Sequence, residues 1–405
     1  MQSCLDIIPE HTKRVLVAFS GGLDSSVLLD LLVDRDPEFE IVPWHINHGL
    51  HDAASAMEAF CVERAAHYNL DLKIDRLELG GIESNIEAEA RKQRYSLFER
   101  HGRAHDCILT AHHADDQAET FLLNALRGSG SAGLRGIAQR RKIGEAWLLR
   151  PLLKFSRVEL ETYAAERELP WYNDPSNRES RFDRNYLRNE VSPILRKRWP
   201  NFQDSLATAS SLQVETQTLL DEFAAEDLDR LKRDESGGFA TLDLAALLEL
   251  GVARRHNLIR YWIAHAALPA LTQARMHELD RQLHARVDAT PEIAMPDYSI
   301  RIYDQRLFLV TVQSLRECSG EYDFGLETEI EIEACELRSS RQAIFEQLDI
   351  PDRAQPLTLK FPGQGQSGQD RHRLKRLFQK HRVPPWQRSS VAQVYLDGEL
   401  AGILP

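Results

Sequence analysis

The sequence predicts an α/β protein with three parts: an N-terminal domain built on a parallel sheet, a helical middle domain and a small α+β C-terminal domain. Between residue 14 and about residue 150, apolar β-branched runs alternate with segments of helical periodicity. From about Trp199 long amphipathic helices take over, and the last 50 residues mix strands with one basic helix. Because 405 residues exceed one ordinary core, we expect domains at 1–200, 201–315 and 316–405.

The first strand and helix are joined by an unusual turn in VLVAFSGGLDSSVLLDLL, residues 15–32. The run 15–19 has the length and composition of a buried strand, and the apolar residues at 27, 28, 31 and 32 recur at helical spacing. Gly21 and Gly22 allow a sharp turn and a close approach of the backbone to a ligand, and the amides that follow open a helix N-terminus. The stretch therefore predicts an anion site, although an ordinary turn between a strand and a helix can have the same composition.

The turn departs from the two commonest nucleotide-binding loops. It has neither the Gly-Lys-Ser/Thr of the P-loop nor GxGxxG. It resembles the pyrophosphate-binding loop of the N-type ATP pyrophosphatases, which cleave ATP to AMP and pyrophosphate. The acidic Asp24 inside such a loop would repel phosphates without a cation, so we expect it to hold Mg²⁺. The ATP-binding residues expected from this loop and the next strand are Ser20, Gly21, Gly22, Leu23, Asp24, Ser25, Ser26 and His45.

Six further elements follow in order up to residue 128. We expect strands at 40–50, 71–79 and 107–113, and helices at 53–70, 86–102 and 114–128. Polar clusters follow three of the strands, at 20–25, 45–49 and 112–116. Since ligands of such sheets bind outside the carboxyl ends of the strands, we expect the clusters to converge. Each alone has an ordinary explanation, as loop histidines or first-turn acids of a helix.

The third cluster opens the helix at 114–128. His112 and Asp116 are four residues apart and Asp116 and Glu119 three apart, so a helical start would bring the three side chains together. We expect the apolar residues 121, 122 and 125 of this helix to face the core.

Five stretches together resemble one family. TAHHADDQAETFLLNALRGSGSAGLRGI at 110–137, HINHGLH at 45–51, NIEAEARKQRYSLF at 85–98, RPLL at 150–153 and DPSNRESRFDRNYLRN at 174–189 are similar to the tRNA(Ile)-lysidine synthetase family, in its order. The match covers about the first 200 residues. One departure is His51, where the family pattern has arginine.

The resemblance implies a ligase that modifies the wobble cytidine, position 34, of isoleucine tRNA with a CAU anticodon. ATP adenylylates the C2 oxygen, and the ε-amine of free L-lysine then displaces AMP to give lysidine. The residues that this implies as catalytic are Asp24, His112, Asp116, Arg184 and Arg188, with Asp116 and Glu119 binding lysine. His112 is a candidate base because a lysine amine attacks only when neutral.

Several basic stretches are candidate tRNA contacts. The segment 174–189 is either a loop and helix facing the nucleotide or tRNA, or a solvated face. Residues 125–136, with Arg127, form either a lid or a plain linker. In the middle domain, arginines at 254, 255 and 260 with His256 are either an RNA face or ordinary surface residues.

The C-terminal part is basic although the whole chain carries a net charge of −12. Residues 356–405 hold eight Lys or Arg against three Asp or Glu. We expect one helix there to turn leucines and Phe378 inward and its basic residues toward RNA. The tRNA-binding residues expected are Arg127, Arg373, Lys375, Arg376, Lys380 and Arg382.

The remaining composition excludes other classes. No run approaches a membrane span and no signal pattern opens the chain, so we expect a cytoplasmic protein without a membrane partner. The five cysteines are scattered without a CxxC, which weighs against a disulfide framework, a metal cluster and a tRNA thiolase. An amidotransferase-linked synthetase and a non-catalytic, nucleotide-dependent RNA-binding protein remain alternatives. The sequence also leaves a homodimer open.

Overall fold

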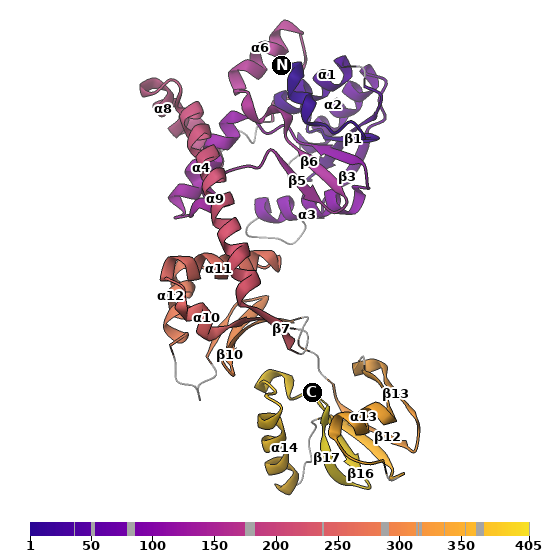
Figure 1. Cartoon of the computed structure of the whole chain (residues 1–405). Coiled ribbons are helices and arrows are strands. Elements are labelled where there is room, and N and C mark those ends of the chain that lie inside the picture. Colours follow the sequence, from indigo (N-terminus) through magenta and orange to yellow (C-terminus); the bar gives the residue numbers. More distant parts are fainter. Residues whose placement is uncertain are drawn as a thin grey trace. The chain divides into compact units, whose positions relative to one another are not determined.

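A computed structural model describes residues 1–35, 37–49, 53–78, 86–174, 183–236, 239–284, 291–312, 315, 318–335, 337–352, 354–361 and 368–404 (Figure 1). The chain divides into two compact units, Met1–Thr218 and Leu219–Pro405. None of the described helices combines the length and the apolar composition that a membrane span requires.

The first unit is built on a six-stranded sheet in the order β3-β2-β1-β4-β6-β5. Its strands are β1 (Arg14–Ala18), β2 (Glu40–Asn47), β3 (Lys73–Arg76), β4 (Asp106–Leu109), β5 (Arg140–Ile143) and β6 (Ala146–Leu149). All neighbours run parallel except β5, which is antiparallel to β6. The parallel sheet expected from the strand and helix alternation is therefore confirmed, with one antiparallel strand at its edge.

Helices cover both faces of this sheet, as Figure 1 shows. On β1, Val15 and Val17 pack into one core with the leucines of α1 (Leu23–Asp34), whereas Leu16 faces the other core with Phe98 of α3 (Ile86–His101). The remaining helical elements are η1 (Gln2–Ile7), α2 (Ala53–His67), α4 (Ala114–Leu126), α5 (Ser131–Leu134), η2 (Pro151–Lys154), α6 (Arg157–Glu166), α7 (Asp183–Tyr186), the π-helical turn η4 (Leu187–Val191), α8 (Ser192–Arg198) and α9 (Phe202–Leu231).

The middle part of the chain contains a five-stranded sheet in addition to the helices expected there. Its order is β7-β8-β11-β10-β9, formed by β7 (Lys232–Ser236), β8 (Phe239–Asp243), β9 (Glu292–Ala294), β10 (Tyr298–Tyr303) and β11 (Arg306–Thr311). The helices α10 (Leu244–Glu249), α11 (Val252–His265) and α12 (Gln273–Gln282) pack on it. The amphipathic stretch 242–268 is not one of the long helices expected after Trp199, because Asp243 caps α10 and Gly251 is the N-cap of a new helix, α11.

Two of the middle-domain residues offered as an RNA face lie in the interior. Arg255 is buried and donates to Asp280 and to the Leu250 carbonyl, and His256 is buried beside it. Arg254 pairs with the buried Asp227 at 2.6 Å. The RNA-face alternative is therefore wrong for residues 255 and 256.

The C-terminal part holds a four-stranded sheet in the order β12-β15-β16-β17 and a separate hairpin of β13 and β14. The elements are β12 (Gly320–Gly325), β13 (Glu329–Ile332), η6 (Glu333–Cys335), β14 (Leu337–Ser340), α13 (Arg341–Leu348), β15 (Leu357–Phe361), α14 (Gly368–Lys380), η7 (Pro385–Gln387), β16 (Ala392–Leu396) and β17 (Glu399–Leu404). The mixture of strands with one basic helix, expected over the last 50 residues, is confirmed by β15, α14, β16 and β17. The segment from β12 to α13 was not anticipated.

Candidate active site

The loop between β1 and α1 forms the turn expected of an anion site. Gly21 adopts a φ of +80°, and a Cβ there would lie 3.0 Å from both Cys61 Sγ and Phe60 Cδ1. Gly22 is the N-cap of α1, so the first-turn amides of that helix, which have no intrahelical acceptor, point toward the loop's open side. Hydrogen bonds from Ser25 Oγ to the Gly22 carbonyl and from Ser26 Oγ to the Gly21 carbonyl brace the turn.

Not all of the residues expected to bind ATP have side chains that could contact the nucleotide. Leu23, Ser25 and Ser26 are buried, so they can contribute backbone amides rather than side chains to an anion. His45 is also buried, and its Nδ1 lies 3.0 Å from the Phe19 carbonyl and 3.4 Å from Cys61 Sγ. Burial lowers the pKa of His45, which favours the neutral ring. This ring contacts the Phe19 carbonyl just before the loop and therefore has a structural role.

The helix α4 turns its polar side inward. Asp116, Gln117 and Glu119 are buried, whereas Phe121 and Leu122 are half-buried and Ala125 is exposed. The expectation that the apolar residues 121, 122 and 125 face the core was therefore wrong for this helix. The reason is that other segments supply charged and amide partners to the polar side, which makes its burial tolerable.

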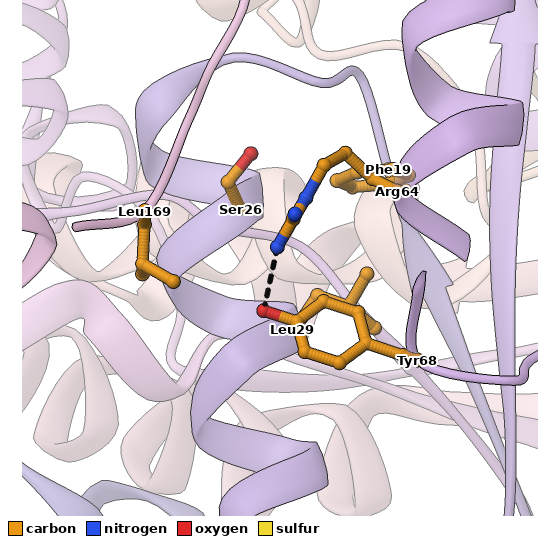
Figure 2. A pocket seen from close by; sticks show the side chains of 6 residues that line it. All are labelled: Phe19, Ser26, Leu29, Arg64, Tyr68 and Leu169. Atoms are coloured by element: carbon orange, nitrogen blue, oxygen red, sulfur yellow. Dashed lines mark hydrogen bonds between the residues drawn. The ribbon is translucent and has the colours of Figure 1, made fainter. Parts of the chain in front are cut away.

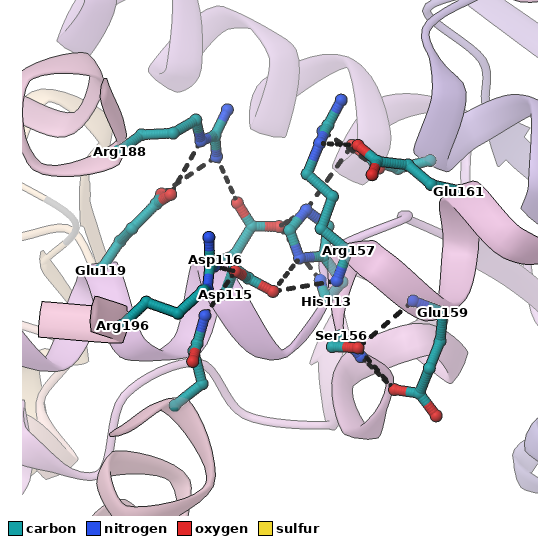
Figure 3. Close-up of polar contacts among 12 residues, drawn as sticks. His113, Asp115, Asp116, Glu119, Ser156, Arg157, Glu159, Glu161, Arg188 and Arg196 are labelled. Atoms are coloured by element: carbon teal, nitrogen blue, oxygen red, sulfur yellow. Dashed lines mark hydrogen bonds and ion pairs between the residues drawn. The ribbon is translucent and has the colours of Figure 1, made fainter. Parts of the chain in front are cut away.

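Two arginines from the segment of α7 and η4 neutralise the carboxylates of α4. Arg188 Nε donates to Glu119 Oε1 at 2.8 Å, and Arg188 Nη2 donates to Asp116 Oδ1 at 3.0 Å (Figure 3). Arg184 Nε donates to Glu119 Oε2 at 2.9 Å. Only 3% of the Glu119 side chain is exposed, so these ion pairs lie in a poorly solvated site. Arg184, Arg188, Asp116 and Glu119 are thus brought together.

The central residue of the site is His113, whereas the sequence pointed to His112. His113 caps α4, and its ring lies 3.6 Å from Asp116, 3.7 Å from Asp24 and 3.7 Å from Asp115. Burial opposes protonation of the ring, but the three carboxylates outweigh it and raise the pKa of His113. The signal that could have found it was its place directly before a helix, with Asp three residues later.

His112 lies at the edge of the same cluster. Its Nδ1 is 3.0 Å from Thr110 Oγ1, and burial lowers its pKa to about 3. The imidazole is therefore neutral at physiological pH.

Asp24 and Asp116 differ in how well neighbouring positive groups compensate their negative charge. Burial raises the pKa of Asp24 despite the nearby His113 and Arg157, whose Nη1 lies 3.4 Å from Asp24 Oδ1. Burial would also raise the pKa of Asp116, but His113 and Arg184 outweigh it and the pKa is lowered. Of the two, Asp24 is thus the carboxylate whose negative charge is less well compensated.

Asp115 belongs to the polar cluster 112–116, whose acids had the ordinary alternative of first-turn acids of a helix, and in the structure it joins four segments. Its carboxylate accepts from the Arg157 amide at 2.9 Å, from Arg196 Nη2 at 3.0 Å and from Gln203 Nε2 at 2.9 Å. Figure 3 shows it between His113 and Arg196. No local pattern marks Arg157, Arg196 or Gln203 as site residues, because they come from α6, α8 and α9.

Asp24 fits a magnesium ion in the manner typical of phosphate sites. Mg²⁺ is usually held by one or two carboxylates together with substrate phosphates and water, not by a protein cage. Within the described residues, no three His, Cys, Asp or Glu side chains form a metal cluster by themselves. A single, incompletely compensated carboxylate in an anion-binding loop meets that requirement.

A small hollow beneath the loop is not the ligand site. It is lined by Phe19, Ser26, Leu29, Arg64, Tyr68 and Leu169 (Figure 2). It is too narrow to admit a water molecule. Arg64 donates to the Tyr68 hydroxyl, which itself donates to the buried Asp30, so the polar groups there are satisfied internally.

The expected tRNA-binding residues lie on the surface. On α14, Leu374 and Phe378 are buried while Arg373, Lys375, Arg376 and Lys380 are exposed, as expected from their spacing. Arg382 is exposed and forms an ion pair with Asp304 at 3.2 Å.

The segment that follows α4 is held in place. Arg127 is exposed and pairs with Asp183 at 3.1 Å. Asn124 Nδ2 donates to the Gly133 carbonyl at 2.8 Å, and Ser131 Oγ donates to Gln217 at 2.7 Å. The residues expected to form a lid or a linker thus include the short helix α5, packed against α4 and α9.

The expected loop at 175 and 176 and the departure at residue 51 lie outside the described residues.

Three family models match the chain in order. The PP-loop domain matches residues 2–195, the TilS substrate binding domain residues 242–308, and the TilS substrate C-terminal domain residues 359–404. The first match contains the loop, α4 and the paired arginines. The second and third fall in the middle part and in the C-terminal sheet with α14.

Curated relatives extend over nearly the whole chain. The tRNA(Ile)-lysidine synthase of Serratia proteamaculans is 37% identical over 401 residues, covering 97% of this chain and 91% of that protein. Those of Yersinia pseudotuberculosis serotype I and Photobacterium profundum are 35% and 32% identical, covering 96% and 99% of this chain and 89% and 93% of those proteins. With this identity over nearly the full length, and with the loop, the acidic helix and both substrate-domain matches in order, the chain belongs to the tRNA(Ile)-lysidine synthase family.

Proposed function

We propose that this chain is an ATP-dependent tRNA-modifying ligase that converts cytidine 34 of isoleucine tRNA with a CAU anticodon to lysidine. The observation that carries the proposal is the convergence, at the carboxyl ends of β1 and β4, of an anion-binding loop and a buried carboxylate pair. Such a pairing suits a reaction that uses both a polyphosphate and an amine. The family membership supports the choice of substrates.

The first half-reaction joins cytosine to AMP. The C2 oxygen attacks the α-phosphorus of ATP, a new O–P bond forms, and the bond to pyrophosphate breaks. The residues proposed to bind ATP are Ser20, Gly21, Gly22, Leu23, Asp24, Ser25 and Ser26, with His45 supporting the loop. Asp24 would hold Mg²⁺, which supplies charge neutralisation at the phosphates when bound.

The second half-reaction transfers lysine. The neutral ε-amine of L-lysine attacks C2, the C2–O bond breaks, and AMP leaves with the oxygen. Asp116 and Glu119 are proposed to bind lysine, because two buried carboxylates attract an ammonium group strongly. His112 is proposed to take the amine's proton, since nearby phosphate charge would raise its pKa from the low value that burial causes.

Each of the three domains has a proposed role in catalysis or in binding the substrates. We propose that residues 1–200 hold the catalytic domain, 201–315 a helical substrate-binding domain, and 316–405 a tRNA-binding domain. Arg127 and the basic residues of α14 with Arg382 are the proposed tRNA contacts. A cytoplasmic location and a homodimer are part of the proposal.

The decisive experiment incubates the purified protein with ATP, Mg²⁺, isotope-labelled L-lysine and the isoleucine tRNA. Mass spectrometry of the digested tRNA should show one labelled lysidine at position 34, and pyrophosphate should be released stoichiometrically. Labelled lysine absent from the tRNA would contradict the proposal. A tRNA whose position 34 is uridine is the control and should remain unmodified.

A further inference from the structure

Arginine side chains already contact the carboxylate pair that is proposed to bind lysine. Arg188 donates to Glu119 Oε1, to Glu119 Oε2 and to Asp116 Oδ1 at 2.8, 3.0 and 3.0 Å. Arg184 donates to Glu119 Oε2 at 2.9 Å, and the His113 amide donates to Asp116 Oδ2 at 3.0 Å. Every carboxylate oxygen of the pair therefore has a donor.

A lysine ammonium cannot simply join this arrangement. Two guanidinium groups already balance the two carboxylates, so a third cation would be uncompensated in a poorly solvated site. Lysine must instead replace an arginine, and the displaced guanidinium then needs another anion. Without such an anion, displacement leaves a buried cation unpaired, which opposes lysine binding.

The phosphates of the nucleotide supply that anion. The His113 ring lies 3.7 Å from Asp24 and 3.6 Å from Asp116, so the carboxylate pair that Arg188 contacts is adjacent to the anion-binding turn. Arg188 and Asp24 are close enough to interact electrostatically. A guanidinium binds phosphate oxygens bidentately as well as it binds carboxylates. Arg188 also lies in the π-helical turn Leu187–Val191, an irregular geometry often found at functional sites.

We propose that Arg188, with Arg184, keeps the Asp116 and Glu119 pair closed to lysine until the phosphates of the bound nucleotide draw the guanidinium groups away. This rests on the proposed function and gives it an order: nucleotide first, lysine second. The order suits the chemistry, because lysine is then admitted only where an activated base can form. Nucleotide and lysine binding are coupled through these two side chains.

The test uses the unmodified protein without tRNA. Calorimetry measures the Kd of L-lysine with and without a saturating non-hydrolysable ATP analogue and Mg²⁺. The nucleotide should tighten lysine binding about tenfold or more, within the usual range of coupling between sites. Because coupling is reciprocal, lysine should tighten binding of the analogue by the same factor. Equal lysine affinities in the two conditions would overturn the proposal.

Substitutions test whether Arg188 couples nucleotide binding to lysine binding. In Arg188→Gln, lysine should bind without nucleotide nearly as tightly as it binds the unmodified protein with nucleotide, and the nucleotide effect should largely disappear. Arg188→Lys keeps the positive charge but loses the paired N–H donors of the guanidinium group, so it should retain part of the nucleotide effect on lysine affinity. Lys197→Gln removes an exposed charge from the adjoining helix and should keep the full coupling. A folded Arg188→Gln with undiminished coupling would contradict the assignment, and the measurement on the unmodified protein stands even if this variant unfolds.

The lysidine assay separates this inference from the proposed function. If lysidine forms but lysine binds independently of nucleotide, the gating role fails and the proposed function stands. If the protein forms no lysidine and binds no lysine in either condition, the proposed function fails.

Discussion

Positively charged side chains occupy opposite surroundings in two regions of this molecule. In the active site, Arg184 and Arg188 expose 28% and 29% of their side chains and contact buried carboxylates at 2.8 to 3.0 Å. On α14, Arg373, Lys375, Arg376 and Lys380 point into solvent from an amphipathic helix.

The positive charges of the two regions therefore differ in the strength of their interactions and in how far salt screens them. Buried charges interact strongly through fixed geometry, and salt screens them little, so removing one group should act on a single step. Exposed charges act through their sum, are screened by salt, and each contributes little. The variants below are ordered by the size of the change that we expect, and each one tests this separation.

Asp24→Asn should reduce pyrophosphate release by about 100-fold or more while leaving tRNA binding nearly unchanged. The carboxylate is proposed to hold Mg²⁺ at the phosphates, and loss of one such electrostatic group typically costs this much. A pyrophosphate assay at saturating ATP measures it. Asp34→Asn changes an acid on the same helix that pairs with Arg167, and it should release pyrophosphate normally. Unimpaired release by Asp24→Asn would remove this residue from the catalytic set.

Asp116→Asn and Glu119→Gln should each slow lysine transfer by about tenfold to 100-fold but still form adenylylated tRNA. The amide loses the charge that attracts the ammonium, whereas base activation precedes the amine's arrival. Rapid-quench samples without lysine measure the first step, and samples with lysine measure the second.

Glu166→Gln, an exposed acid on α6, is the control for both steps. A folded Asp116 or Glu119 variant that fails at adenylylation would move that residue to the Mg-ATP site. The lysine pocket would then be unassigned.

Gly21→Ala should weaken ATP binding about tenfold. Its φ of +80° is strained for alanine, and the new methyl group would meet Cys61 and Phe60 at 3.0 Å, so the loop must shift. Gly22→Ala is the matched comparison, because Gly22 has a φ of −72° and its Cβ would meet only Ser20 Oγ, at 3.5 Å. Equal losses in the two variants would show that loop geometry is not the cause.

Neutralising the basic residues of α14 should have the smallest effect per residue. Each of Arg373→Gln, Lys375→Gln, Arg376→Gln and Lys380→Gln should weaken tRNA binding about twofold to threefold at moderate salt. Together they should flatten the plot of log affinity against log salt by about one unit for each phosphate that is no longer neutralised. ATP and lysine affinities should not change. An unaltered salt slope would make α14 an ordinary solvated helix.

Local periodicity encodes the part of the fold that the sequence predicts. The spacing of apolar residues predicted β1, α1 and the inward face of α14, because a half-buried element must repeat its apolar residues at its own period. The Gly-Gly turn and Asp24 were recognisable because the anion-binding geometry lies within a few consecutive residues. Family resemblance named the arginines and carboxylates one by one, without their pairing.

Long-range packing, in contrast, sets which charges meet. Arg188 reaches Glu119 across 69 positions of the chain, and Gln203 reaches Asp115 across 88. The polar side of α4 is buried because those distant partners satisfy it, so the usual rule that apolar residues face the core failed at residues 121, 122 and 125. His113 became central for the same reason. Its three carboxylates come from the first turns of α1 and α4, and their proximity depends on how β1 and β4 pair. The energy of a buried charge depends on neighbours that the local sequence does not contain.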